Sequence, residues 1–316
     1  MDQLNNNFKR FEFRTVIITL VLSVFYFLWF HLNAGKYLNT GLRTDHFSFY
    51  FILVIGYFAH PLTRRLVKGI SVFAIFSFLY DSHKIVPNYI FNPVHISEPY
   101  YLEKALFGFN SIDGFVTPNE FFSQHNHPIL DVLSGFFYLC WTPVPIMLAT
   151  FLTFTDRRLV LRFSLAFLLV NFLGWVIYYS YPAAAPWYVE IYGFTENFTI
   201  PGHVAGLIRF DKFFDIDLFQ KMYTKASNVF AALPSLHSAY PVVAFVYGIK
   251  SKLGWVNILL GIVMVGIWFA AVYTNHHYII DVLLGIIVAL VGIWIFERVL
   301  MKTRLRNWIE TWATKI

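Results

Sequence analysis

Two apolar stretches joined by a short polar turn decide the fold class: residues 254–297 read GWVNILLGIVMVGIWFAAVYTNHHYIIDVLLGIIVALVGIWIFE. The turn divides this run into residues 254–274 and 277–297, and each part has the length of about 20 residues that a helix needs to cross a bilayer. The whole chain shares this character, since 58% of its 316 residues are hydrophobic and 13% are charged. Soluble domains carry about 25% charged residues. We therefore expect an all-α, polytopic membrane helix bundle.

The same criterion predicts about eight spans along the chain. The second and sixth, residues 46–60 and 235–249, are short and leave open merged or re-entrant alternatives. The polar N-terminus is not followed by a short apolar run with a small-residue cleavage site, so we expect the first apolar run to be a membrane anchor. The predicted spans are 15–31, 46–60, 66–80, 129–153, 159–181, 235–249, 254–274 and 277–297.

The distribution of basic residues is a second, independent test of this topology, because short cytoplasmic loops are rich in Lys and Arg. With eight spans, most of the 24 Lys and Arg residues fall in short segments on one side. The other side holds the connection 32–45 and two long segments, 82–128 and 182–234. We therefore predict cytoplasmic termini, partly helical loops on the outer face, and a single domain over residues 1–316.

Composition also excludes two classes of protein. The one cysteine, Cys140, cannot form a disulfide framework within the chain or a cysteine-rich metal site. The net charge of +6 comes from basic residues that flank the apolar runs, whereas a nucleic-acid-binding protein gathers them into one patch. We expect membrane lipids as partners and no nucleic acid; the oligomeric state is not predicted.

Two short polar motifs mark the outer ends of predicted spans. The first is residues 233–238 (LPSLHS), where a loop enters the sixth span, and the second is residues 274–281 (TNHHYIID), where the eighth span begins. The seventh span is a simple return crossing between them. The sixth and eighth spans both run inward from the outer face, so we expect His237 and His277 to meet at the same side of the membrane.

The residue types in these motifs suit phosphoryl transfer. His277 and Asp281 are four apart and share one helical face, so the carboxylate can accept a proton from one ring nitrogen and leave the other free to attack. His237 would act as general acid and base. Helix N-termini favour a phosphoryl group, and Ser235 would either cap its helix or donate to the phosphate. The alternatives are packing histidines, or a proton relay in a transporter.

These motifs resemble a known family. The PSLHSA segment, followed about forty residues later by HHYxxD, resembles two signature motifs of the type 2 phosphatidic acid phosphatase superfamily. The match is closest to the inositol phosphorylceramide synthase branch, which it also resembles in the run AAAPWY (residues 183–188), in NVFAALPSLH and in the doubled histidine at 276–277. Residues Tyr80 and Asp81, followed by VHISEPYYLEKALFG, resemble bacterial relatives of that branch.

The resemblance implies a phosphohistidine mechanism. His277 matches the nucleophile, Asp281 its orienting carboxylate and His237 the general acid and base, while Asp81 matches an acidic position near the first family motif. The resemblance implies no cofactor and no metal ion.

The sequence also departs from the ordinary phosphatase pattern. Ala270 and Ala271 occupy the positions of its Ser-Arg pair, and its Lys-to-Arg-Pro motif is missing. Those cations would neutralise a phosphate monoester, which carries close to two negative charges at neutral pH. A phosphodiester carries one and needs fewer cations, so the departure favours a glycerophospholipid donor. Cations on the same face offer partial substitution: Lys84, Arg209, Lys212, Lys221 and Lys225.

Two aromatic residues, Trp187 and Tyr188, have two interpretations. They line a sugar or headgroup pocket, or they are interfacial anchors of the kind common at membrane surfaces. The anchor interpretation is slightly favoured, and His95, Glu98 and Glu103 share the same ambiguity.

The leading hypothesis is a membrane enzyme that moves phosphoinositol from phosphatidylinositol to a ceramide-type acceptor and releases diacylglycerol. A lipid phosphatase acting on phosphatidic acid or a polyprenyl diphosphate is the main alternative, and a transporter with a histidine–aspartate relay is a third. We expect the site on the non-cytoplasmic face and, in a bacterium, in the inner membrane.

Overall fold

The computed structural model describes residues 21–30, 32, 44–83, 86–224 and 228–316. A helix covers Val21–Phe30. The elements that follow are α2 (Thr44–Ala59), α3 (Pro61–Ser82), η1 (Asn88–Ile90), α4 (Ser97–Phe107), β1 (Phe109–Ser111), β2 (Gly114–Val116), α5 (Pro118–Gln124), α6 (Pro128–Leu139), α7 (Pro143–Thr155), α8 (Arg157–Ser180), α9 (Pro186–Tyr192), η2 (Ala205–Leu207), α10 (Ile208–Phe214), α11 (Leu218–Tyr223), α12 (Leu236–Lys250), α13 (Val256–Tyr273), α14 (Ile279–Trp294), η3 (Ile295–Val299), η4 (Leu300–Lys302) and α15 (Leu305–Ala313).

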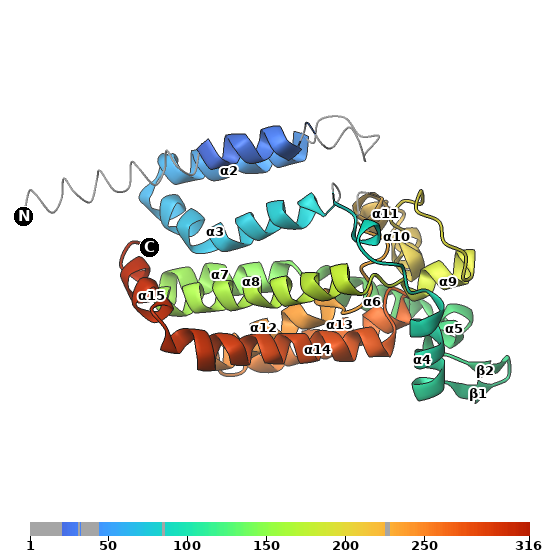
Figure 1. The fold of residues 1–316 in the computed structure, drawn as a ribbon. Helices are drawn as coiled ribbons and strands as arrows, with labels where there is room; N and C mark the ends of the chain where they lie inside the picture. The colour runs from blue at the N-terminus through green and yellow to red at the C-terminus, as the bar shows by residue number, and fades with distance from the viewer. Residues whose placement is uncertain (1–20, 31, 33–43, 84–85, 225–227) are drawn as a thin grey trace, which may run out of the picture.

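The long helices run side by side, and the short elements gather at the ends (Figure 1). Helix α12 packs against α8, α13 and α14, and α3 packs against α7 and α8. The short elements α4, α5, β1, β2, α9, α10 and α11 lie at one end of these helices, whereas α15 lies at the other (Figure 1). The predicted helical bundle is therefore confirmed, with the two long loop segments at one end.

Helix α14 shows how small residues position the bundle. Large apolar side chains such as Ile287 and Trp294 are exposed on its outer face. On its inner face, a Cβ atom at Gly292 would lie 2.6 Å from a methyl carbon of Val170 in α8, and one at Gly285 would clash with the carbonyl oxygen of Ser235. Small residues let helix backbones approach closely in membrane proteins. The apolar outer face then contacts lipid.

The number of spans is not confirmed. Among the described residues, three helices are long and apolar enough to cross a membrane: Arg157–Ser180, Val256–Tyr273 and Ile279–Lys302. A fourth candidate is the pair α6 and α7, which is bent by 40°. The remaining predicted spans are shorter or more polar: α2 has 16 residues and α12 has 15. The first predicted span starts outside the described residues.

The predicted span over residues 129–153 is broken into two helices. The helix stops at Leu139 and restarts at Pro143. Pro143 and Pro145 explain the break, because proline lacks the N–H group of the helical hydrogen bond and its ring crowds the carbonyl group four residues earlier. The break lets α6 reach the end of the bundle at which both histidine motifs lie.

The end of the bundle near α15 collects the basic residues of the short loops. The Lys68 ammonium donates to the carbonyl oxygen of Lys315 at 2.7 Å, and Arg158 pairs with Glu310 at 2.7 Å. This clustering agrees with the predicted division of the chain between two sides.

The opposite end carries the elements that surround the histidine motifs. The loop segments at this end are partly helical as predicted, and α4 is one of their helices. The antiparallel hairpin of β1 and β2 follows it and was not predicted.

Candidate functional site

Two backbone contacts bring the histidine motifs together. Ser235 N–H donates to the carbonyl oxygen of Asp281 at 2.9 Å, so the start of α12 is attached to the first turn of α14. Gly285, one turn further along α14, leaves room for the Ser235 carbonyl. The Ser235 hydroxyl accepts from Ser238 N–H at 3.3 Å and caps α12. The capping alternative for Ser235 is thus confirmed, and its role towards phosphate stays a prediction.

The imidazole rings of His237 and His277 are in direct contact. His237 Nδ1 lies 3.2 Å from His277 Nε2. His277 Nδ1 lies 3.0 Å from the carbonyl oxygen of Ala232, which can only accept a hydrogen bond. His277 therefore carries its proton on Nδ1, and the lone pair of Nε2 faces His237. His277 is buried, while His237 is partly exposed.

Asp281 has a less direct role in orienting His277 than the spacing predicts. Its Oδ2 atom lies 3.5 Å from His277 Nδ1 and accepts from the N–H of Tyr278 at 2.8 Å. The Ala232 carbonyl is the nearer partner of the ring. Within the described residues, Asp281 Oδ1 has no hydrogen-bond partner although the residue is buried. Asp281 thus fixes the turn and places a carboxyl group beside the imidazole.

Sequence reasoning missed Tyr138 on α6. Its hydroxyl lies 3.0 Å from His237 Nδ1, and its side chain is fully buried. The Trp141 ring packs against His237 with centroids 4.7 Å apart. No motif spacing signals either residue. Tyr138 lies at the end of α6 and Trp141 in the break before α7, and folding brings both to His237.

Glu103 and Asn119 hold the turn that carries His277. The two carboxylate oxygens of Glu103 accept from the N–H groups of Ile279 and Ile280 at 3.0 and 3.1 Å, so Glu103 caps α14 from another segment. The amide of Asn119 donates to the carbonyl oxygen of His277 at 3.0 Å. Burial raises the pKa of Glu103 to about 7 although both N–H groups act to lower it. This contact resolves the ambiguity over Glu103: it is buried beside the motif.

Comparison with known proteins agrees with the motif assignment. A family profile described as the PAP2 superfamily matches residues 115–295, which is more than half of the chain and includes both histidine motifs. The chain belongs to the PAP2 superfamily.

Several PAP2 relatives carry names that describe an activity. The chain is 46% identical over 295 residues to a phosphoinositol dihydroceramide synthase of Bacteroides thetaiotaomicron, which covers 92% of this chain and 96% of the relative. It is 30% identical over 176 residues to an inositol phosphorylceramide synthase of Candida albicans, covering 54% of this chain and 36% of that protein. A catalytic subunit of that enzyme in Schizosaccharomyces pombe is 24% identical over 240 residues, covering 73% and 54%. No solved structure matches the chain.

The interfacial-anchor interpretation of Trp187 and Tyr188 is wrong, because both side chains are buried inside this PAP2 protein. Tyr188 hydroxyl donates to the carbonyl oxygen of Thr195 at 2.7 Å and accepts from Asn197 N–H. Trp187 stacks on His203 with ring centroids 5.2 Å apart, and its backbone N–H donates to the carbonyl oxygen of Asn275 at 3.1 Å. A role of either residue towards substrate stays a prediction.

Three further predicted residues lie wholly or partly outside the described part of the chain. Asp81 is in the last turn of α3, and its side chain is outside the described part of the chain. Lys84 and Lys225 also lie outside the described residues. The structure therefore leaves their predicted roles untested.

Arg209 is one of the cations that the sequence offers as a substitute for the missing family arginine. It pairs with Asp131 at 2.6 Å and lies over the Tyr273 ring at 5.3 Å. Asp131 also accepts from the Tyr273 hydroxyl at 2.9 Å. Arg209 is thus committed to a contact that supports the turn. Among the described residues, no group of three or more His, Cys, Asp or Glu is arranged to hold a metal ion.

Proposed function

We propose that this protein transfers phosphoinositol from phosphatidylinositol to the primary hydroxyl of a ceramide-type lipid, through a phosphohistidine at His277. The observation that carries the proposal is the contact between His237 and His277, in which the Ala232 carbonyl fixes the tautomer of the second ring. The name of the bacterial relative, 46% identical over nearly its whole length, supports the same substrates.

The first half-reaction loads His277. The lone pair of its Nε2 attacks the phosphorus of phosphatidylinositol, so an N–P bond forms as the bond to the diacylglycerol oxygen breaks. His237 gives a proton to the leaving oxygen and stabilises its developing charge. Asp281 and the Ala232 carbonyl keep the ring oriented and favour the positive charge that His277 gains.

The second half-reaction returns the enzyme to its starting state. His237, now neutral, takes the proton of the acceptor hydroxyl while that oxygen attacks phosphorus. The N–P bond breaks, its electron pair returns to His277 Nε2, and the phosphoinositol is carried by the acceptor lipid. The protons and electron pairs balance over the two steps.

The electrostatics of the site support a phosphodiester donor. Ala270 and Ala271 are fully buried where the ordinary phosphatase pattern has Ser-Arg, and Arg209 is engaged by Asp131. A monoester with nearly two negative charges would need more cations than a diester with one. The burial of His277 also favours a lipid acceptor over water, because a closed site excludes hydrolysis.

We also propose that the site lies on the non-cytoplasmic face and, in a bacterium, in the inner membrane. The basic residues of the short loops lie at the α15 end, which is the end that the positive-inside rule assigns to the cytoplasm. A membrane-impermeant maleimide tests this in whole cells, with Cys140→Ala as background. Ile112→Cys in the hairpin should react, and Arg306→Cys near α15 should react only after lysis. The reverse pattern would overturn the orientation.

Purified protein tests the reaction itself. Liposomes with labelled phosphatidylinositol and ceramide should yield labelled phosphoinositol-ceramide and diacylglycerol. His277→Ala should lower the rate by roughly 10³-fold or more, whereas the control His60→Gln, an exposed histidine at the other end, should not change it. Full activity of His277→Ala would remove the mechanism. Release of free phosphate from phosphatidic acid, with no product from phosphatidylinositol, would instead identify a phosphatase.

A further inference from the structure

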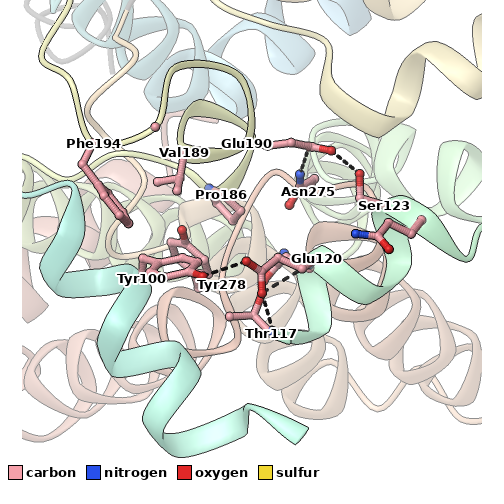
Figure 2. A pocket seen from close by; sticks show the side chains of 13 residues that line it. Tyr100, Thr117, Glu120, Ser123, Pro186, Val189, Glu190, Phe194, Asn275 and Tyr278 are labelled. Carbon is pink, nitrogen blue, oxygen red and sulfur yellow. Dashed lines mark hydrogen bonds between the residues drawn. The ribbon is translucent and has the colours of Figure 1, made fainter. Parts of the chain in front are cut away.

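A cavity of about 320 Å³ lies between α4, α5, α9 and the turn at 274–278 (Figure 2). It is separate from the space between the two imidazole rings. Its lining residues are Tyr100, Thr117, Asn119, Glu120, Ser123, Gln124, Pro186, Val189, Glu190, Gly193, Phe194, Asn275 and Tyr278.

The cavity is built on the turn that carries His277. Asn275 and Tyr278 line it, and they precede and follow the doubled histidine. Asn119, a third lining residue, donates to the carbonyl oxygen of His277. The cavity therefore borders residues on both sides of the nucleophile in the chain.

Three buried polar atoms of the lining await a partner. Among the described residues, Tyr278 Oη, Asn119 Oδ1 and Asn275 Oδ1 form no hydrogen bond. Their residues are 1%, 2% and 6% exposed. Folded proteins leave few buried polar groups unsatisfied, so each such group calls for an explanation. Three of them in one lining leave the polar network around the cavity incomplete.

The charges of the lining argue against an anion as the ligand of the cavity. Glu120 accepts from the Tyr100 hydroxyl and from Thr117 N–H, both at 2.7 Å, and lies 3.5 Å from the Lys104 ammonium. Burial acts to raise the pKa of Glu120, but these hydrogen bonds and the Lys104 charge outweigh it and lower the pKa, so the group is a carboxylate. A second acid, Glu190, adds negative charge that would repel phosphate.

The carboxylates of the lining already have hydrogen-bond donors. Glu190 accepts from the Ser123 hydroxyl and from the Asn275 amide (Figure 2). Glu120 has the three donors named above. A hydroxyl group both donates and accepts, so it can join a network of carboxylates, amides and hydroxyls.

The cavity also has an apolar wall, formed by Pro186, Val189 and Phe194. Polar groups line the remainder, including Tyr100, Glu120 and Asn275 (Figure 2). A ring that carries hydroxyl groups at its edge and C–H bonds on its face matches both parts. We propose that this cavity binds the polyhydroxylated ring of the donor lipid's headgroup, an inference that rests on the proposed function.

Donor selectivity tests this assignment in the full-length protein. The KM for phosphatidylinositol and the rate ratio of phosphatidylinositol to phosphatidylglycerol are measured with one ceramide acceptor. Tyr100→Phe and Ser123→Ala should each raise the KM for phosphatidylinositol by roughly 10-fold. Each should also lower the rate ratio of phosphatidylinositol to phosphatidylglycerol. The matched control Tyr101→Phe alters an exposed neighbour on the same helix and should leave both unchanged.

A cavity-filling variant keeps the test independent of the polar network. Val189→Phe puts an aromatic ring into the cavity and should raise the KM for phosphatidylinositol more than that for phosphatidylglycerol. The exposed control Glu196→Gln should behave as wild type. Equal losses for all donors, or an unchanged KM in every lining variant, would show that the cavity is structural and overturn the proposal. A wild-type preference for phosphatidylcholine would assign it a cationic headgroup and overturn it too.

The two proposals fail in different ways. If wild-type protein makes no product from phosphatidylinositol under any condition, the proposed function itself is wrong. If wild-type protein is active and the lining variants match their controls, only the assignment of the cavity is wrong.

Discussion

The two ends of the bundle treat buried carboxylates in opposite ways. At the α15 end, Glu297 accepts from the Tyr247 hydroxyl at 2.6 Å, lies 2.8 Å from Lys250 and pairs with Arg162. At the other end, Glu103 and Asp281 accept from backbone N–H groups, and no Lys or Arg of the described residues pairs with either. One end pairs its carboxylate with cations, while the other satisfies its carboxyl groups with backbone N–H donors near the two imidazole rings.

This difference separates a structural network from a reactive one. A buried ion pair holds segments in place, and breaking one side of it is costly because the partner charge remains. A carboxylate without a cation remains free to interact with a neighbouring group whose charge changes during a reaction. Substitutions at the two ends should therefore differ in whether they reduce stability or rate.

The largest effect is expected at Asp281. Asp281→Asn keeps an acceptor for Tyr278 N–H but removes the negative charge that favours charged His277. We expect kcat to fall on the order of 10²- to 10⁴-fold, with a small change in the free energy of unfolding. Initial rates and denaturant titration in detergent measure both. A large loss of stability with a normal rate per folded molecule would contradict the comparison.

The reverse pattern is expected for Glu297→Gln. This change leaves Arg162 and Lys250 without their shared carboxylate. We expect unfolding to become easier by about 2–3 kcal/mol, less than for fully buried pairs because both cations are partly exposed. The rate per folded molecule should stay near that of wild type. If kcat falls as it does in Asp281→Asn, the α15 end is coupled to the chemistry and the division between the ends fails.

Tyrosines allow a matched test between the two ends. Tyr138→Phe removes the hydroxyl beside His237 Nδ1 and should lower kcat by roughly 10-fold. It should also shift the pH at which the rate is half-maximal, a readout that a purely structural residue would not move. Tyr247→Phe, an equally buried tyrosine beside Glu297, is the control and should affect stability alone. An unchanged pH profile in Tyr138→Phe would exclude a positioning role.

The smallest effect concerns Glu103 and pH. Its pKa is raised to about 7 in the folded protein from a usual value of 4.5, so the folded state binds the proton more tightly between these values. The contribution of Glu103 is therefore most favourable below pH 4.5, and stability should decline as pH rises through 7. Glu103→Gln should flatten this decline, changing the melting midpoint by about 2–4 °C. Parallel curves for the two proteins would refute the assignment.

The sequence was sufficient for the helices and for the meeting of the two histidines. Apolar runs of bilayer length predict helices such as α8, α13 and α14, and two helices that start on the same side must bring His237 and His277 to the same end. Both inferences rest on the length and the order of the apolar runs, which a single sequence displays.

The structure added contacts that no spacing reports. The closest partner of His277 Nδ1 is the backbone carbonyl of Ala232, and every residue type offers such a group. Glu103 caps α14 from 176 positions earlier in the chain, and Tyr138 reaches His237 because α6 is separated from α7. These contacts depend on three-dimensional packing. Pro143 and Pro145 were the available signal for the break between α6 and α7, but the apolar composition around them concealed it.

Gly285 has a consequence for anyone who wishes to redesign this enzyme. Its missing side chain is the space in which the Ser235 carbonyl rests, and Ser235 begins the helix that presents His237. Even one methyl group at this position would push the two imidazoles apart without touching either. A library that alters headgroup preference should therefore randomise the cavity wall and hold position 285 constant, because the spacing of the reactive pair is encoded by a residue that takes no part in it.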